Sequence, residues 1–145
     1  MDTVTKVTEH IREHDKLIDL FDMDIQETAP GRAKLSMRVG KNHLNAAKLC
    51  HGAALFALAD VAFALAANCH GQMALAIEAS INYFRPVKEG SVITVTCEQE
   101  YQGRRTGVYF ATVYSEDHVK VAIFKATAFR IEAGSVYEFG RNEDS

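Results

Sequence analysis

The chain has 145 residues, of which 48% are hydrophobic and 24% are charged, and its formal net charge is −3. These values predict one globular domain with its own core, and they exclude a mainly disordered chain. Basic residues are scattered among acidic ones, so we expect no nucleic-acid partner. The start MDTVTKVTEHIREHDKL is too polar for a signal peptide. The most apolar stretch is too short and carries a central charge, so we expect no membrane span.

The three cysteines also bear on the cell compartment. Cys50, Cys69 and Cys97 are odd in number and lack the spacing of a disulfide scaffold. Such cysteines are typical of free thiols in a reducing environment. The sequence therefore predicts a cytoplasmic protein.

The first half of the chain contains two predicted helices with a hairpin between them. An amphipathic pattern over residues 3–21 predicts an N-terminal helix. Residues 23–40 predict two strands around a turn at 27–32, because apolar and polar residues alternate after the turn. A loop, residues 41–50, leads into an apolar helix over residues 51–68.

The second half is predicted to be strand-rich. The β-rich runs span residues 74–84, 91–101, 106–115 and 120–131. The short polar turns between them are typical of an antiparallel meander. We expect the domain to span residues 1–137 and to be followed by a polar tail, residues 138–145.

One helix that is apolar nearly all round, with about six antiparallel strands, restricts the fold. The sheet must curve around the helix and cover it, which is the hotdog fold of the α+β class, here with an added N-terminal helix. An α+β sandwich with the helix on one face fits the pattern almost as well.

Asp60 is the one charged residue inside the apolar helix. Its neighbours at helical spacing, Phe56, Ala57, Phe63 and Ala64, cannot pair with a carboxylate. Burying an unpaired carboxylate costs several kcal/mol or raises its pKa. A functional role for Asp60 is therefore more plausible than a purely structural one.

Several segments together resemble the PaaI-type acyl-CoA thioesterases of the hotdog superfamily, the phenylacetate-degradation branch. They are HLNAAKLCHGAALFALADVAFALAAN, NYFRP, QGRRTGVY and AIFKATAFRI, and the similarity extends over residues 20–132. Ala46 and Ala53 stand where the family commonly has glycine. Ala76 stands where wider relatives place a serine or threonine that helps to hold water, so we expect that helper to be absent.

The residues themselves indicate how a thioester would be hydrolysed. Gly52 lies where the helix begins, so its backbone N–H is free to bind an oxyanion, and similarity to the family agrees. Asp60 would act as general base or nucleophile. Asn45 would hold the aspartate or the substrate carbonyl, and His51 would shape the loop or contact the thioester. Structural capping is the alternative for Asn45 and His51.

Gly52 and Asp60 are eight residues apart, which is about 12 Å along a straight helix. Reacting groups must converge to about 3 Å from one atom. Two helices that run antiparallel across a two-fold axis would bring Asp60 of one chain to Gly52 of the other. The resemblance implies the same arrangement, a homodimer or a dimer of dimers with sites at the interface.

Other residues are candidates for binding the rest of the substrate. Two segments are candidates for binding coenzyme A, and their arginines would bind its phosphates. The candidate residues are Arg85, Pro86, Arg104, Arg105 and Thr106. The alternative is that the arginines are solvated turn residues. Phe56 and Phe63, beside Asp60, would line an acyl pocket or belong to the core.

We expect no metal and no organic cofactor. Cys50–His51 and Cys69–His70 lie at opposite ends of the central helix, so one chain cannot join them in a zinc site. The resemblance implies hydrolysis of an acyl-CoA, with an aromatic, hydroxyphenylacetyl-like acyl group. The alternatives are a hotdog hydratase or dehydratase and a non-catalytic acyl-CoA-binding module.

Overall fold

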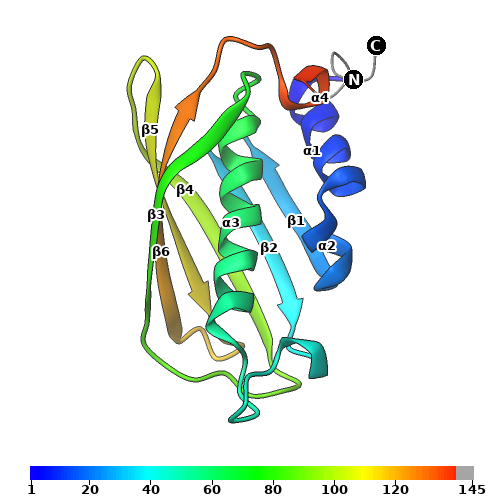
Figure 1. Ribbon diagram of the computed structural model, residues 1–145, viewed down its shortest axis with the longest axis vertical. Coiled ribbons are helices and arrows are strands. Elements are labelled where there is room, and N and C mark those ends of the chain that lie inside the picture. The colour runs from blue at the N-terminus through cyan, green and yellow to red at the C-terminus, as the bar shows by residue number, and fades with distance from the viewer. Residues whose placement is uncertain (140–145) are drawn as a thin grey trace.

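The computed structural model describes residues 1–139, which form a six-stranded sheet and four α-helices (Figure 1). The α-helices are α1 (Thr3–His14), α2 (Lys16–Leu20), α3 (Gly52–Asn68) and α4 (Val136–Phe139), and a short 3₁₀ helix, η1, spans Lys41–His43. The strands are β1 (Met23–Ala29), β2 (Arg32–Arg38), β3 (Ala74–Tyr83), β4 (Val92–Gln102), β5 (Thr106–Tyr114) and β6 (Lys120–Arg130).

The sheet is antiparallel throughout, with the strand order β1-β2-β4-β5-β6-β3. It curves around α3, which lies along its inner face (Figure 1). The predicted hotdog fold with an N-terminal helix is therefore confirmed. The central helix begins at Gly52, one residue later than predicted, because His51 is its N-cap.

The core lies between α3 and the sheet. Leu58, Leu65 and Ala62 of α3 have no exposed surface, and Leu35 and Phe124 meet them from the sheet. Each large apolar side chain buried in this way contributes about 1.5–3 kcal/mol to stability. A helix that is apolar on most of its circumference is stable here because the sheet and α1 cover it.

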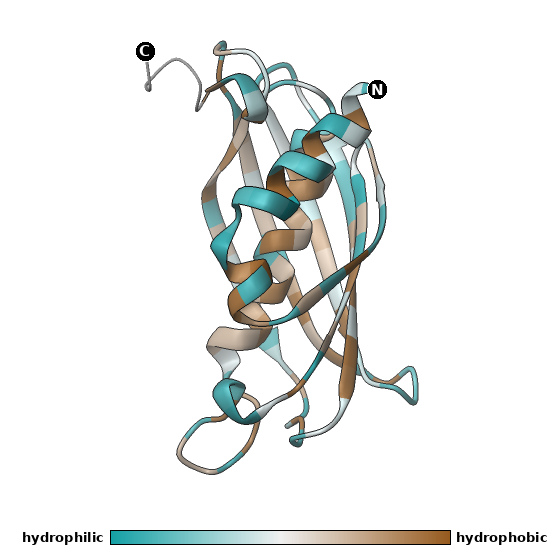
Figure 2. Cartoon of the chain, turned by 90° about the vertical axis from the view of Figure 1, so that its right-hand side faces the viewer, coloured by the Kyte–Doolittle hydropathy of each residue, from teal (hydrophilic) through white to brown (hydrophobic). Residues whose placement is uncertain are grey.

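The N-terminal helix differs from the prediction, because it is interrupted at Asp15. The backbone of Asp15 is extended, and its N–H still donates to the carbonyl of Ile11 at 2.8 Å. Its side chain accepts from the N–H of Leu17 at 3.1 Å and so caps the new helix α2. An aspartate competes with the helical backbone for hydrogen bonds, which explains the break. The N-terminal helices carry both hydrophobic and hydrophilic residues (Figure 2), and Val7 and Ile11 of α1 and Ile18 of α2 are buried.

β3 is an edge strand with its second side unpaired. Residues 75–80 are all exposed, whereas residues of the inner strands β4, β5 and β6 mostly alternate between buried and partly buried. Leu75 and Ile77 are 49% and 62% exposed. A ten-residue edge with exposed apolar side chains is an open template for another strand.

The C-terminal end of the described chain packs against the N-terminal helix. α4 lies beside α1 (Figure 1), with Lys6 over the ring of Tyr137 at 6.0 Å. The predicted tail begins at residue 138, but residues 138 and 139 belong to α4. Residues 140–145 lie outside the described part of the chain. Within residues 1–139, no helix is long and apolar enough to cross a membrane.

Candidate active site

The N-terminus of α3 exposes one unused backbone donor. The side chain of His51 caps the helix by accepting from the N–H of Ala53 at 3.1 Å. The N–H groups of Ala54 and Leu55 donate to the carbonyl of His51. No acceptor among residues 1–139 bonds to the N–H of Gly52. The positive end of the helix therefore presents this amide to a ligand.

Tyr83, which was not among the predicted site residues, fixes the surroundings of Gly52. Its hydroxyl, at the end of β3, donates to the carbonyl of Gly52 at 2.8 Å. A Cβ at position 52 would lie 2.9 Å from Cζ of Tyr83, so only glycine fits without a shift. The sequence motif NYFRP contains Tyr83, but the contact joins residues 31 apart and is not visible in any local pattern.

Asn45 is held in the loop before α3. Its Oδ1 accepts from the N–H of Ala47 at 2.9 Å and from that of Leu49 at 3.1 Å. These bonds fix the orientation of the side chain. The oxygen of the Asn45 amide therefore has the structural, loop-capping role that was the alternative to a catalytic one. The other half, the Nδ2 group, donates to no acceptor within the described residues.

Asn45 and Gly52 line the same depression, of about 340 Å³, which we call the Gly52 pocket. The predicted ligand residues Arg85 and Pro86 also line it. Its full lining is Asn45, Leu49, Cys50, Gly52, Leu55, Tyr83, Phe84, Arg85, Pro86 and Val87. Burial raises the pKa of the Cys50 thiol to about 11, so this cysteine stays protonated and is a poor nucleophile.

Asp60 is half-buried and lies on the same face of α3 as Gly52. Gly52, Phe56, Asp60 and Ala64 follow at intervals of four, and all four are only partly buried. Asp60 has no hydrogen bond or ion pair within residues 1–139. Its pKa is raised, first by burial and then by the negative charge of Asp15. A carboxylate in such surroundings is a stronger base than an exposed one.

One chain does not bring Gly52 and Asp60 together. α3 is continuous from Gly52 to Asn68, so the two residues remain about 12 Å apart along its axis.

The two predicted acyl-pocket residues, Phe56 and Phe63, lie in different surroundings. Phe56 is partly exposed beside Asp60, with its ring against Phe124 at 5.2 Å. Phe63 is 2% exposed and packs in the core against Tyr109, at 5.3 Å between ring centroids.

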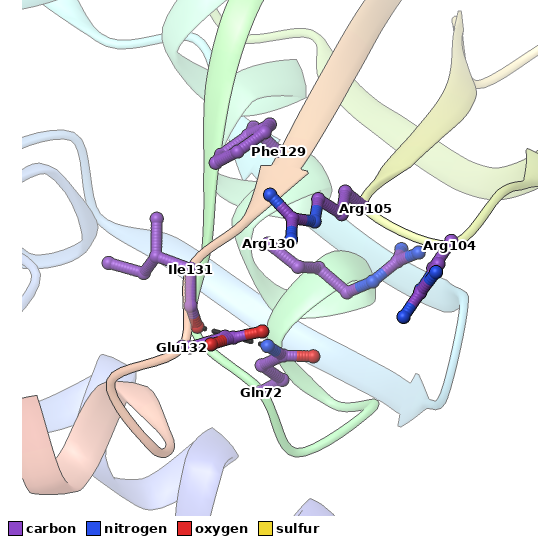
Figure 3. A pocket seen from close by; sticks show the side chains of 7 residues that line it. All are labelled: Gln72, Arg104, Arg105, Phe129, Arg130, Ile131 and Glu132. Atoms are coloured by element: carbon purple, nitrogen blue, oxygen red, sulfur yellow. Dashed lines mark hydrogen bonds between the residues drawn. The ribbon is translucent and has the colours of Figure 1, made fainter.

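The remaining candidates form a second depression, of about 350 Å³, which we call the arginine pocket (Figure 3). It is lined by Gln72, Arg104, Arg105, Phe129, Arg130, Ile131 and Glu132. Thr106 is the first residue of β5, directly after Arg104 and Arg105 in the β4–β5 hairpin. Sequence reasoning missed Arg130, whose apolar neighbours in AIFKATAFRI are typical of a buried strand.

The two pockets lie at opposite ends of the folded domain. The Gly52 pocket is at the start of α3 and the end of β3, whereas the β4–β5 hairpin is at the other end of the sheet (Figure 1). Arg85 is therefore separated from Arg104 and Arg105 within one chain. Cys50–His51 and Cys69–His70 are likewise at opposite ends of α3. Residues 1–139 contain no group of three or more His, Cys, Asp or Glu that could hold a metal ion.

Comparison with known proteins identifies the family. The model of the thioesterase superfamily matches residues 47–122. A protein of Archaeoglobus fulgidus that is provisionally named an esterase is 41% identical over 128 residues, which is 88% of this chain and 83% of the relative. The acyl-coenzyme A thioesterase PaaI of Escherichia coli is 36% identical over 119 residues, 82% of this chain and 85% of the relative.

Solved structures agree with this assignment. The structure of the E. coli PaaI protein from the phenylacetic acid degradation operon superposes with a TM-score of 0.87 at 33% identity, covering 92% of this chain and 96% of that one. A protein of Streptococcus pneumoniae that is described as a hypothetical thioesterase, in a crystal structure with coenzyme A, superposes with a TM-score of 0.79 at 25% identity, covering 86% of this chain and 98% of that one. The chain therefore belongs to the thioesterase superfamily and is an enzyme of the PaaI type with the hotdog fold.

Proposed function

We propose that the protein is an acyl-CoA thioesterase that hydrolyses an acyl-CoA to a free acid and coenzyme A, at sites shared by two chains. The observation that carries this proposal is the pair formed by the unused N–H of Gly52 and the unpaired carboxylate of Asp60 on one face of α3. An oxyanion donor and a base are the two groups that thioester hydrolysis requires. The name of the E. coli relative supports the same activity.

The exposed edge of β3 supports a homodimer. Two β3 edges can pair antiparallel around a two-fold axis, which would cover Leu75 and Ile77 and satisfy the free backbone groups. The antiparallel arrangement brings the partly buried faces of two α3 helices toward each other. Asp60 of one chain then lies beside Gly52 of its partner, which removes the 12 Å separation.

The reaction at such a site has a simple sequence. The thioester oxygen accepts hydrogen bonds from the N–H of Gly52 and from Nδ2 of Asn45. The carboxylate of Asp60 takes a proton from water, whose oxygen adds to the thioester carbon. The C–S bond breaks, and the proton passes to the departing thiolate. In the direct route, Asp60 adds to the carbon, expels the thiolate, and the resulting anhydride is hydrolysed by water.

An aromatic acyl group is the proposed substrate type. The E. coli structure comes from a phenylacetic acid degradation operon, and the ring of Phe56 lies one turn from Asp60. An aromatic ring beside the base would stack on an aryl-acetyl group such as hydroxyphenylacetyl. Ala76, exposed on β3, offers no hydroxyl to hold water, so Asp60 would position the water without that helper.

The test is release of free thiol from a panel of short, long and aromatic acyl-CoAs. We expect turnover, with the highest kcat/KM for an aryl-acetyl-CoA. Binding of acyl-CoA without thiol release would indicate a binding module. Consumption of an enoyl-CoA without thiol release would indicate a hydratase, and either result would refute the proposal.

The shared site has its own test, in dimers that contain one Asp60→Asn chain and one Asn45→Asp chain. Asn45→Asp keeps the acceptor for Ala47 and Leu49, loses the Nδ2 donor and adds a negative charge where the thioester oxygen becomes negative. In a mixed dimer, one site has both defects and the other has neither, so about half of wild-type activity should appear. Mixed dimers as inactive as their parents would refute the shared site.

A further inference from the structure

The loop before α3, residues 43–51, is closed on itself, and we call it the Asn45 loop. The N–H of His51 donates to the carbonyl of His43 at 2.7 Å, and the N–H of Asn45 donates to that of Leu49 at 2.8 Å. An antiparallel bridge lies between these two bonds. The loop is therefore a small hairpin with His43 and His51 at its base and Asn45 near its tip.

The second arm of this loop, residues 49–51, is fixed to the rest of the domain. The N–H of Cys50 donates to the carbonyl of Val87 at 2.8 Å. His51 is the N-cap of α3, and its side chain accepts from the N–H of Ala53 at 3.1 Å. The amide of Gly52, the next residue, is thus positioned by α3 itself.

The first arm, residues 43–45, is anchored at its start by the side chain of His43. This side chain is buried, and its Nδ1 accepts from the N–H of Gly40 at 2.9 Å. The edge of the ring meets Phe21 at 5.2 Å between centroids. A ring nitrogen that accepts carries no proton, so His43 is bound as the neutral tautomer with its proton on Nε2.

The position of Asn45 matters because its Nδ2 group is proposed to donate to the thioester oxygen together with the N–H of Gly52. Two donors stabilise an oxyanion only where both lie within hydrogen-bond distance of it. A displacement of about 1 Å can cost a large part of the rate. The arm that carries Asn45 must therefore keep its place relative to α3.

We infer that His43 is a positioning residue, whose Nδ1 holds the Asn45 loop so that the Asn45 amide and the Gly52 N–H meet at one oxygen. The inference rests on the proposed function and extends it to a residue that touches no substrate. His43 acts through Asn45 and has no part in proton transfer.

Two substitutions at position 43 separate the hydrogen bond from the packing. His43→Asn keeps an acceptor in the place of Nδ1 and loses most of the ring contact with Phe21. His43→Leu keeps apolar bulk against Phe21 and loses the acceptor. We expect His43→Asn to retain kcat and His43→Leu to lower it about tenfold with little change in KM.

Phe21→Leu is the matched control for packing. It should lower the melting temperature and leave kcat of the folded enzyme unchanged. If kcat follows the melting temperature across all three variants, or if His43→Asn loses more activity than His43→Leu, His43 has only a packing role and the inference is overturned.

Double variants show whether His43 acts through Asn45. Asn45→Ser removes the Nδ2 donor, adds no charge and keeps an oxygen that can accept in the turn. In this background, His43→Leu should lower kcat by less than about twofold, because the group that it displaces is already absent. In the Asp60→Asn background, the same change should still cost about tenfold. An equal loss in both backgrounds would refute action through Asn45.

Hydrogen exchange tests the positioning without turnover. The N–H groups of Ala47 and Leu49 donate to Oδ1 of Asn45, so their exchange rates report how firmly this side chain is held. Both rates should rise several-fold in His43→Leu and stay at the wild-type value in His43→Asn. Unchanged rates in His43→Leu would overturn the inference, whereas a wild-type protein that releases no thiol from any acyl-CoA would refute the proposed function alone.

Discussion

The hydroxyl of Tyr83 donates to the carbonyl of Gly52 at 2.8 Å, and this bond joins the end of the edge strand to the start of the central helix. The ring occupies the space that any larger residue at position 52 would need. The position and the accessibility of the Gly52 amide therefore depend on a residue of β3, the strand that is proposed to form the dimer.

Gly52→Ala tests this dependence. The added Cβ would lie 2.9 Å from Cζ of Tyr83, so the ring must shift and its hydrogen bond to the Gly52 carbonyl is strained. We expect kcat to fall at least tenfold, because the methyl group also blocks a carbonyl from the amide. The better helix propensity of alanine, up to about 1 kcal/mol, should partly offset the loss in stability.

Tyr83→Ala provides the matched background, because it removes the ring. In that background, Gly52→Ala should no longer lower the free energy of unfolding, although activity should remain low. A similar loss of stability in both backgrounds, measured by urea denaturation, would mean that Tyr83 is not the source of the conflict.

Asp60→Asn should lower kcat by about 10²-fold or more while the fold and the dimer persist, because shape is kept and the base is lost. The variant should also be more stable than wild type at neutral pH. A carboxyl with a raised folded pKa stabilises the fold only while it is protonated. As pH rises through the interval between its unfolded pKa, about 3.9, and its raised folded pKa, wild type loses stability and the variant does not.

Thermal melts at several pH values test this expectation. The two melting temperatures should converge as the pH falls below that interval. Asp19→Asn, a change of the same kind at an exposed position of α2, should shift neither the melting temperature nor kcat appreciably. Full activity of folded Asp60→Asn would remove Asp60 from the mechanism.

The charge of Asp15 should be visible in the pH dependence of kcat. Asp15 is the second cause of the raised pKa of Asp60, after burial. Asp15→Asn removes the charge and keeps a helix-capping oxygen. The pKa of Asp60 should fall, so the acidic limb of the kcat profile should move to lower pH. Asp19→Asn again serves as control, and an unmoved limb in Asp15→Asn would contradict the electrostatic link.

Arg104→Ala and Arg105→Ala should each raise KM for acyl-CoA and leave kcat nearly unchanged, because they are proposed to bind the nucleotide and not the reacting atoms. Arg12→Ala, at an exposed position of α1, is the matched loss of positive charge. If Arg12→Ala raises KM for acyl-CoA as much as Arg104→Ala or Arg105→Ala does, the increase reflects the overall charge of the protein and not a specific phosphate site.

Much of the fold could be predicted from local pattern. The apolar run that forms α3 and the alternation in β2 are repeated over many residues, so both elements were placed within one or two residues. The break at Asp15 was missed because one side chain decides it, through a single cap at Leu17. Apolar spacing continues past that residue and gives no sign of the interruption.

The site was less predictable, because its contacts join distant parts of the chain. Gly52 and Asn45 are close in sequence, and both line one pocket. Tyr83 meets Gly52 only because β3 runs back along α3. Arg85 and Arg104 have the same side chain and were predicted to bind the same ligand. The topology of the sheet places them at opposite ends of the folded domain.

The unpaired edge of β3 also affects how the enzyme should behave on dilution. If each site needs two chains joined along this edge, a separated chain has no complete site. Specific activity should then be constant at high protein concentration and decline once the concentration falls below the dissociation constant of the dimer. In the dilute regime, the rate should follow the square of the enzyme concentration, so an enzyme assay alone reports how strongly the two strands hold together.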